Sequence, residues 1–264
     1  MKKFTLPALL LFAALFSSCT DEPTNPNAHC SLENSLKLQT GNYWIYNTIR
    51  TDTNGIDIPG TEGIDSTIVA GTRMIAGKQA YLLISYGNSQ PDTMYYAVEG
   101  GRAYQLLSSM ANIFDGYGCG CFPMKWVAFA DCSRSQWKAL DTIKEGLTYK
   151  VVDATGTPQD SKTQWHYLAD GFSKGNESVV VGNSTVEASA FQTKGFFTFS
   201  LLTPLDARFA PSGLRDLPMK VNNTFWLVDG IGIVKYHSEG FDRFQGPTQI
   251  VNGIRKTLIR YSVK

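Results

Sequence analysis

Apolar and aromatic residues occur along this chain in short runs that are separated by turn-forming residues. Four such runs lie in the first hundred residues, at 43–46, 67–69, 80–86 and 94–98, with Gly, Pro, Asn or Asp near their ends. Short β-branched and aromatic runs at regular spacing, with turn residues between them, are typical of antiparallel sheet. The pattern therefore predicts a mainly β protein.

The clearest alternation lies at the end of the sequence. Thr257, Ile259, Tyr261 and Val263 alternate with a second set of residues that is polar except for Leu258, namely Lys256, Arg260, Ser262 and Lys264. A period of two is that of a strand with one face buried. We expect the first set to face inward and the second to face largely outward.

Helical patterns are weak. Residues 108–114 fit a turn or two of helix, and residues 133–145 fit either a short helix or a strand. The three prolines of residues 203–220 predict a long irregular connection, and long loops in compact domains are often functional. The Gly-rich residues 116–123 predict another irregular loop, which we expect to be cross-linked.

The two halves of the chain show a weak internal similarity. The first half begins with an aromatic segment, Gly41–Tyr46, and the second half begins with another, Ser135–Lys138. We interpret the chain as one antiparallel curved sheet or half-barrel made of two similar meanders, with few short helices. The domain would span residues 30–264, with pseudo-halves at 30–125 and 126–264.

The first residues have the features of an export signal. Met1–Lys3 is charged, residues 6–16 are mostly apolar, and small residues precede Cys19. The apolar run is shorter than the ~20 residues of a membrane-spanning helix. Residues 1–18 are therefore predicted to be a signal peptide.

The junction Phe16-Ser17-Ser18-Cys19 resembles the lipobox of bacterial lipoproteins, although that family usually has Leu where Phe16 stands. The resemblance implies cleavage before Cys19 and its acylation with palmitate-type chains, which would anchor the protein in the membrane. In that family an Asp directly after the cysteine retains the protein at the inner membrane, so Thr20 at this position implies the outer membrane. The acidic pair Asp21-Glu22 resembles the export signal of some surface lipoproteins. The alternative is an ordinary secretory signal in which Cys19 is incidental.

Residues 19–29 are polar, contain proline and predict a lipidated tether. Removal of residues 1–18 leaves 22 basic and 23 acidic side chains. Such a balance gives no electrostatic support for binding nucleic acid or for a polybasic membrane contact. Membrane attachment would have to come from the N-terminal lipid, and the domain would face the periplasm or the cell surface.

The cysteine count fits the anchor. Acylation of Cys19 leaves four cysteines, Cys30, Cys119, Cys121 and Cys132, and exported proteins form disulfides readily. A ring between Cys119 and Cys121 would be strained, so we expect Cys132 to pair with one of these two and Cys30 with the other. A metal site at Cys119, Cys121 and Cys132 is the alternative, although a C-x-C pair lacks the usual zinc spacing.

Patterns for catalysis are missing from the sequence. His29 lies in the tether, and His166 and His237 lie in strand-like runs without the H-E-x-x-H frame of zinc hydrolases. No G-x-S-x-G elbow or phosphate-binding loop occurs. Gly230-Ile231-Gly232 lacks the third glycine of a nucleotide fingerprint, and we expect a tight turn or bulge that enters a strand. We predict no cofactor, metal or catalytic residue.

Two kinds of side chain keep other functions open. Carboxylates such as Asp131, Asp141, Asp170 and Asp229 would serve a carbohydrate-active hydrolase if two of them met across a cleft. The five tryptophans are expected to pack in the core, although aromatic rings on a concave face would also suit a lipid or a sugar. These are Trp44, Trp126, Trp137, Trp165 and Trp226.

The body resembles a loose group of exported bacterial proteins with a G-x-x-W-x-Y opening, here Gly41, Trp44 and Tyr46, and a late G-I-G-I-V-K segment, here 230–235. It also resembles the curved half-barrel of periplasmic lipoprotein carriers, whose concave face holds acyl chains. The resemblance implies a concave sheet that binds a hydrophobic ligand and carries over no catalytic residue.

These features favour a non-enzymatic, membrane-anchored lipoprotein of the bacterial envelope whose domain binds a hydrophobic small molecule. A carbohydrate-active hydrolase would instead need two facing carboxylates across a cleft. A structural or adhesive module, bound to another envelope protein, would have a filled interior and an exposed apolar patch.

Overall fold

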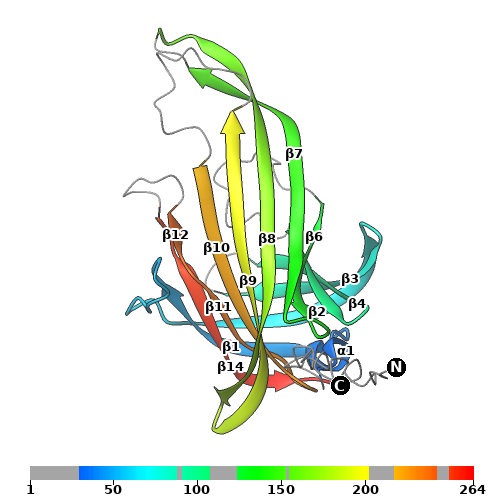
Figure 1. Cartoon of the computed structure of the whole chain (residues 1–264). Coiled ribbons are helices and arrows are strands. Elements are labelled where there is room, and N and C mark those ends of the chain that lie inside the picture. Colours follow the sequence, from blue (N-terminus) through cyan, green and yellow to red (C-terminus); the bar gives the residue numbers. More distant parts are fainter. Residues whose placement is uncertain (1–29, 88–90, 108–123, 153–154, 202–216, 243–249) are drawn as a thin grey trace, which may run out of the picture.

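The computed structural model describes residues 30–87, 91–107, 124–152, 155–201, 217–242 and 250–264, and within them twelve antiparallel strands form one sheet. The strand order is β6-β5-β4-β3-β2-β1-β14-β11-β10-β9-β8-β7. The predicted mainly β fold, with an antiparallel curved sheet and little helix, is confirmed (Figure 1).

The first six strands form a meander in chain order. They are β1 (Tyr43–Thr51), β2 (Gly63–Ile75), β3 (Lys78–Tyr86), β4 (Asp92–Glu99), β5 (Arg102–Leu106) and β6 (Trp126–Asp131). Each pairs with the next, and each predicted apolar run of the first hundred residues lies within one of the first four strands.

The second meander contains the three longest strands, β7, β8 and β9. Its strands are β7 (Gln136–Val152), β8 (Pro158–Val181), β9 (Ser184–Leu201), β10 (Leu217–Val228), β11 (Gly232–Ser238) and β14 (Gly253–Ser262). A separate pair, β12 (Phe241–Asp242) and β13 (Ile250–Val251), stands beside it. The chain changes from one meander to the other between β6 and β7, so β6 belongs to the first. The assignment of residues 30–264 to a single domain stays a prediction.

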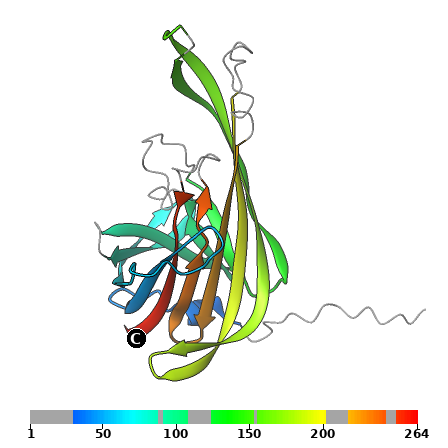
Figure 2. The ribbon, with the colours of Figure 1, turned by 90° about the vertical axis from the view of Figure 1, so that its left-hand side faces the viewer.

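The two meanders meet where β1 pairs with β14, and the sheet curls until its two edges come close. In Figure 1, β7 to β10 run up the page while β1 to β3 run across it, and Figure 2 shows the curvature from the side. At the edges, Trp137 of β7 donates its indole N–H to the Ala128 carbonyl of β6, at 2.7 Å. The interior of the curl holds the core, which includes Phe129, Phe191 and Phe225.

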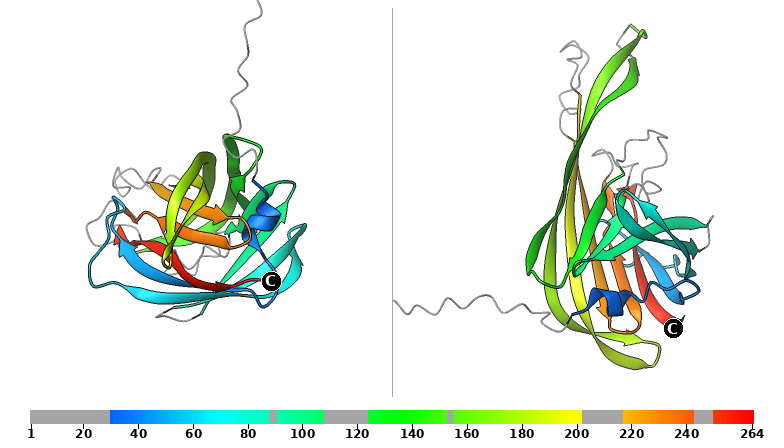
Figure 3. Two further views of the ribbon diagram at one scale, coloured as in Figure 1. Left: turned by 90° about the horizontal axis from the view of Figure 1, so that it is seen from below. Right: turned by 90° about the vertical axis from the view of Figure 1, so that its right-hand side faces the viewer.

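A five-residue helix, α1 (Leu32–Leu36), lies against one end of the curled sheet (Figure 3). Leu32 and Leu36 are buried in the core. The Ser35 hydroxyl donates to the Asp229 carboxylate, and the Gly230 amide donates to the Asn34 carbonyl at 3.2 Å. The helix is thereby fixed to the β10–β11 turn.

The expected facing of the last strand was wrong for Lys256 and Leu258, which lie before a bulge in the strand. A β-bulge between Ile45 and Tyr46 of β1 leaves Ile259 of β14 as an extra residue, because Arg260 pairs with Ile45 and Leu258 pairs with Tyr46. An inserted residue reverses the alternation on either side of it. Leu258 is therefore completely buried, and the extra residue Ile259 is 38% exposed. Beyond the bulge, Tyr261 pairs with the buried Trp44 but is itself 40% exposed, and Val263 packs against the core as expected.

Other expected elements have mixed outcomes. Of residues 133–145, those from Gln136 onward form strand, not helix. Residues 217–220, expected to be irregular, begin β10; Pro218 is tolerated there because β11 pairs with β10 only from Asn223 onward, so this part of β10 is an edge. The expectations for residues 108–114, 116–123 and 203–216 fall on residues outside the described ones.

The turn expected at residues 230–232 is confirmed, since Gly230 and Gly232 have φ angles of 77° and 115° and β11 starts at Gly232. Within the described residues, no helix has the length and apolar character needed to cross a membrane.

Candidate functional site

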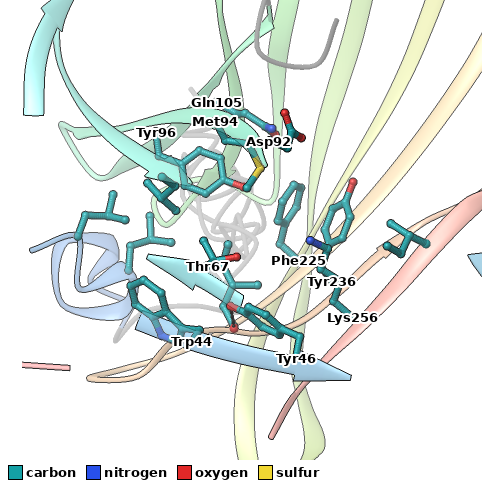
Figure 4. A pocket seen from close by; sticks show the side chains of 15 residues that line it. Trp44, Tyr46, Thr67, Asp92, Met94, Tyr96, Gln105, Phe225, Tyr236 and Lys256 are labelled. Atoms are coloured by element: carbon teal, nitrogen blue, oxygen red, sulfur yellow. Dashed lines mark hydrogen bonds between the residues drawn. The ribbon is translucent and has the colours of Figure 1, made fainter. Parts of the chain in front are cut away.

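A cavity of about 260 Å³ lies inside the curl of the sheet, between the first meander and strands β10, β11 and β14. On the same measure, a cavity of roughly 150 Å³ holds one benzene molecule. The space therefore suits a ligand of about ten non-hydrogen atoms, or that much of a longer one. Figure 4 shows side chains from both meanders around it.

Most of the wall is apolar. The aromatic side chains are those of Trp44, Tyr46, Tyr96, Phe225 and Tyr236. The aliphatic ones are those of Leu36, Leu38, Leu83, Met94, Ile233 and Ile254. Thr67, Asp92, Gln105 and Lys256 complete the lining. An apolar wall with a few polar groups is the usual composition of a small-molecule site.

Two of the aromatic rings are fixed by hydrogen bonds to β11 and its turn. Trp44 donates its indole N–H to the Ile231 carbonyl, and the Tyr46 hydroxyl donates to the Ile233 carbonyl at 2.9 Å. Gly232 makes room for the indole, since a Cβ at this position would lie 2.8 Å from Trp44 Nε1. The wall is thus held in place without any ligand.

The three tyrosine hydroxyls differ in what they bind. Those of Tyr46 and Tyr236 have protein acceptors, the Tyr236 hydroxyl donating to Asn223 Oδ1 at 2.9 Å. In the described part of the chain, the Tyr96 hydroxyl has no hydrogen-bond partner, although only 5% of this residue is exposed. This hydroxyl is not among the polar atoms that the protein seals from water, so it is open to the cavity, where a bound molecule can accept its hydrogen.

All three phenols are held in their neutral, hydrogen-donating form. Burial raises the pKa of Tyr46 well above its usual value, with smaller contributions from Tyr96 and Asp65. Burial likewise raises the pKa of Tyr96, helped by Tyr236 and Asp92, and raises the pKa of Tyr236 to about 12. Because desolvation disfavours the phenolate, these hydroxyls remain donors at any physiological pH.

An ion pair forms one part of the wall. The Lys256 ammonium of β14 bonds to the Asp65 carboxylate of β2, and their side chains are only 18% and 9% exposed. The Ser85 hydroxyl of β3 also donates to Asp65, at 2.6 and 2.8 Å from its two oxygens. The lysine charge at the cavity is therefore already neutralised by the protein.

Lys256 was expected on the outer face, and this expectation was wrong for the same reason as for Leu258. Both residues stand on the same side of the bulge at Ile259, and Lys256 pairs with Thr48 of β1 on the concave side. The sequence held one indication of this inward facing. Leu258, an apolar residue, stands two positions after Lys256 and therefore on the same face, which had been assigned to solvent.

The expected disulfide pairing was wrong. Cys30 is bonded to Cys132, which links the start of the domain to the end of β6. The two cysteines stand next to each other because α1 and the β6–β7 turn lie at the same end of the sheet. Cys19, Cys119 and Cys121 lie outside the described residues, so the predicted lipidation of Cys19 is untested.

The histidines take two different positions. His166 of β8 is on the surface, with Nε2 3.0 Å from Asp141 Oδ1, whereas His237 of β11 is covered by the β1–β2 loop at Gly55. Burial lowers the pKa of His237, and Arg255 adds to the effect. Among the described residues no three His, Cys, Asp or Glu side chains gather as metal ligands would. His29 lies outside the described residues.

The four carboxylates named from the sequence bind four different partners. Asp131 pairs with Arg102 and with Ser133, Asp141 with His166, Asp170 with Lys138, and Asp229 with Ser35. None of the four lines the cavity, where Asp92 is the one carboxylate among the described lining residues. These four carboxylates therefore do not form the pair facing across a cleft that a glycosidase needs.

Of the five tryptophans, Trp44 lines the cavity, and Trp137, Trp165 and Trp226 are buried in the core. Trp126 packs on a smaller cluster with Ile75 and donates its N–H to the Ile75 carbonyl at 3.2 Å. The core role expected for most of them is confirmed.

No protein-family model matches the sequence, and no curated protein matches it. Two solved structures have a detectable likeness in shape. One, from Bacteroides fragilis, is described as an exported protein with a YMCC-like fold; it is 11% identical, with a TM-score of 0.38, over 88% of this chain and 100% of that one. The other, described as a lipoprotein of Parabacteroides distasonis, is 9% identical, with a TM-score of 0.37, over 86% and 99%. Function must therefore be argued from this chain's own residues.

Proposed function

We propose that this protein is a lipid-anchored envelope protein whose curled sheet binds an apolar small molecule. The observation that carries the ligand-binding part is the cavity of about 260 Å³, with its apolar wall and the Tyr96 hydroxyl that is open to it. Filling such a cavity would bring dispersion contacts and remove apolar surface from water. The anchor part rests on the lipobox-like junction at Cys19.

The test of binding uses octan-1-ol, an uncharged probe with about ten non-hydrogen atoms. We expect calorimetric titration to show saturable one-to-one binding, and thermal melting to move upward with probe concentration, because a ligand of the folded state alone stabilises it. Native mass spectrometry of the protein as purified from membranes would show whether a natural ligand remains bound.

A pair of methionine variants assigns the binding to this cavity. Met94→Trp replaces a thioether side chain of the wall with the larger indole ring, which would fill part of the cavity and should abolish octan-1-ol binding. Met74→Trp makes the same change on the surface, where Met74 is 70% exposed, and should leave binding intact. Binding that survives Met94→Trp in a folded variant would contradict the assignment, and absence of binding to the unsubstituted protein would refute the function.

The anchor has a separate test. Intact mass of the detergent-extracted protein should exceed that of residues 19–264 by the mass of an attached lipid with two or three acyl chains. A Cys19→Ser variant should lose these chains and leave the membrane fraction. An unmodified mass would mean that Cys19 is not acylated, whatever the outcome of the binding test.

A further inference from the structure

Two sets of polar side chains at the cavity differ in whether the protein already binds them, and we call them the closed set and the open set. In the closed set, Lys256 and Asp65 are bonded to each other, and Asp65 also accepts a hydrogen bond from the Ser85 hydroxyl. Tyr96 and Gln105 are direct partners on adjacent strands β4 and β5, and both line the cavity. Within the described residues, neither of these two side chains makes a hydrogen bond to the protein.

The closed set works against an anionic ligand. A carboxylate that entered the cavity would lose its hydration shell and would meet the negative charge of Asp65 together with the positive charge of Lys256. Because the ammonium is already compensated, little attraction remains to offset that loss. An uncharged polar group has no comparable desolvation cost.

The open set offers donors to an uncharged acceptor. The Tyr96 hydroxyl stays protonated, and its partner across the strand pair, Gln105, carries an amide that both donates and accepts. The Cβ atoms of directly opposed residues stand about 5 Å apart and on the same face of the sheet. One ligand that enters the cavity can therefore contact both side chains with its polar end.

Resting on the proposed function, we infer that the cavity selects uncharged amphiphiles, such as alcohols and amides with an apolar tail, over the corresponding carboxylates. Tyr96 recognises the polar end of the ligand. The Lys256–Asp65 pair disfavours carboxylates, because it leaves no uncompensated cation at the wall.

The experiment compares octanamide with octanoate at neutral pH, since the two have nearly the same shape and differ in charge. We expect octanamide to bind the unsubstituted protein at least about tenfold more tightly than octanoate. Asp65→Asn frees the Lys256 charge and should raise octanoate affinity about tenfold while octanamide stays within about twofold.

Two tyrosine variants test whether the Tyr96 hydroxyl binds the polar end of the ligand. Tyr96→Phe should weaken octanamide binding about fivefold, the usual effect of one hydrogen bond. Tyr86→Phe is the matched control, because Tyr86 is 48% exposed and does not line the cavity, so octanamide binding should stay unchanged. Equal losses in the two variants would overturn the role of Tyr96.

The results separate the two claims. If octan-1-ol does not bind, the proposed function fails. If octan-1-ol binds and octanoate binds as tightly as octanamide, the cavity is real and the selectivity inference is wrong. The comparison in the unsubstituted protein decides this even if Asp65→Asn does not fold.

Discussion

The indole of Trp137 on β7 lies over Gly171, its direct partner on β8. It fills the space that a side chain at Gly171 would occupy. A Cβ at Gly171 would lie 2.0 Å from Trp137 Cε2 and 2.2 Å from Nε1. The same Nε1 donates to the Ala128 carbonyl of β6. One glycine thus allows one ring to connect the two edges of the sheet.

Gly171→Ala is therefore expected to destabilise the protein, because the indole must move and give up its bond to β6. Overpacking of this kind typically costs about 1–3 kcal/mol. Gly71→Ala is the matched control, since Gly71 also lies in a strand but has open space around its Cβ, and should change stability by less than about 0.5 kcal/mol. Denaturant unfolding measures both; equal effects would show that the ring tolerates displacement.

Removal of the Cys30–Cys132 disulfide should lower the free energy of unfolding by about 2–4 kcal/mol, since the bond joins residues 102 apart in sequence. Denaturant unfolding of a Cys30→Ser/Cys132→Ser variant measures the loss. Peptide mapping without reductant should recover residues 30 and 132 in one linked species, also from a Cys119→Ser/Cys121→Ser variant. A peptide that links residue 30 to 119 or 121 would contradict the structure.

The strands were predictable because their residues carry local patterns. Residues 43–46, 80–86 and 94–98 alternate or cluster strongly enough to identify β1, β3 and β4. The long β8 was harder, since its interior holds Gly171 and Gly175, and Gly175 stands at a bulge with a φ of 81°. From the sequence alone, a glycine such as Gly175 predicts the end of a strand. In the structure it stands at a bulge, where the strand bends and continues.

The cavity was predictable only as a concave face. Trp44 and Tyr46 lie in an opening motif that the sequence singles out, but Tyr96, Tyr236 and Lys256 come together through the pairing of distant strands. A bulge at Ile259 inverted the expected facing of Lys256, and bulges have no reliable local signature. The pairing of Cys30 with Cys132 likewise depends on which ends of the sheet meet.

Arg102→Met should destabilise the protein by about 2 kcal/mol, because it removes a charged partner from a buried carboxylate. Asp131 is completely buried, and Arg102 Nε lies 2.6 Å from its Oδ2. Burial by itself would raise the pKa of Asp131, but the hydrogen bonds from Ser133 and Arg102 outweigh it and lower the pKa.

Because that pKa is lower than in the unfolded chain, the stabilisation exists above about pH 4 and is lost as the pH falls through the folded value. The difference between Arg102→Met and the unsubstituted protein should accordingly shrink in acid. Lys138→Met, which removes a more exposed ion pair with Asp170, serves as the control and should cost less than about 1 kcal/mol. Similar losses in both variants would mean that burial of Asp131 does not matter.

His237 should make the protein less stable in mild acid. Its Nε2 is buried without a hydrogen-bond partner in the described part of the chain, and Gly55 covers it so closely that a Cβ there would lie 2.9 Å from Cε1. Burial first, then Arg255 and Lys235, lower its pKa, and these outweigh the opposing effects of Glu239 and Asp57. Below about pH 6.5 the unfolded chain binds a proton that the folded protein does not, so stability falls as the pH decreases toward the folded pKa.

The melting temperature of the unsubstituted protein should therefore decline between about pH 7 and pH 5.5, and that of His237→Gln should decline much less. His166→Gln is the control, because His166 is a surface residue with 41% side-chain exposure, and this variant should keep the full decline. A decline of equal size in His237→Gln would assign the pH dependence to other groups.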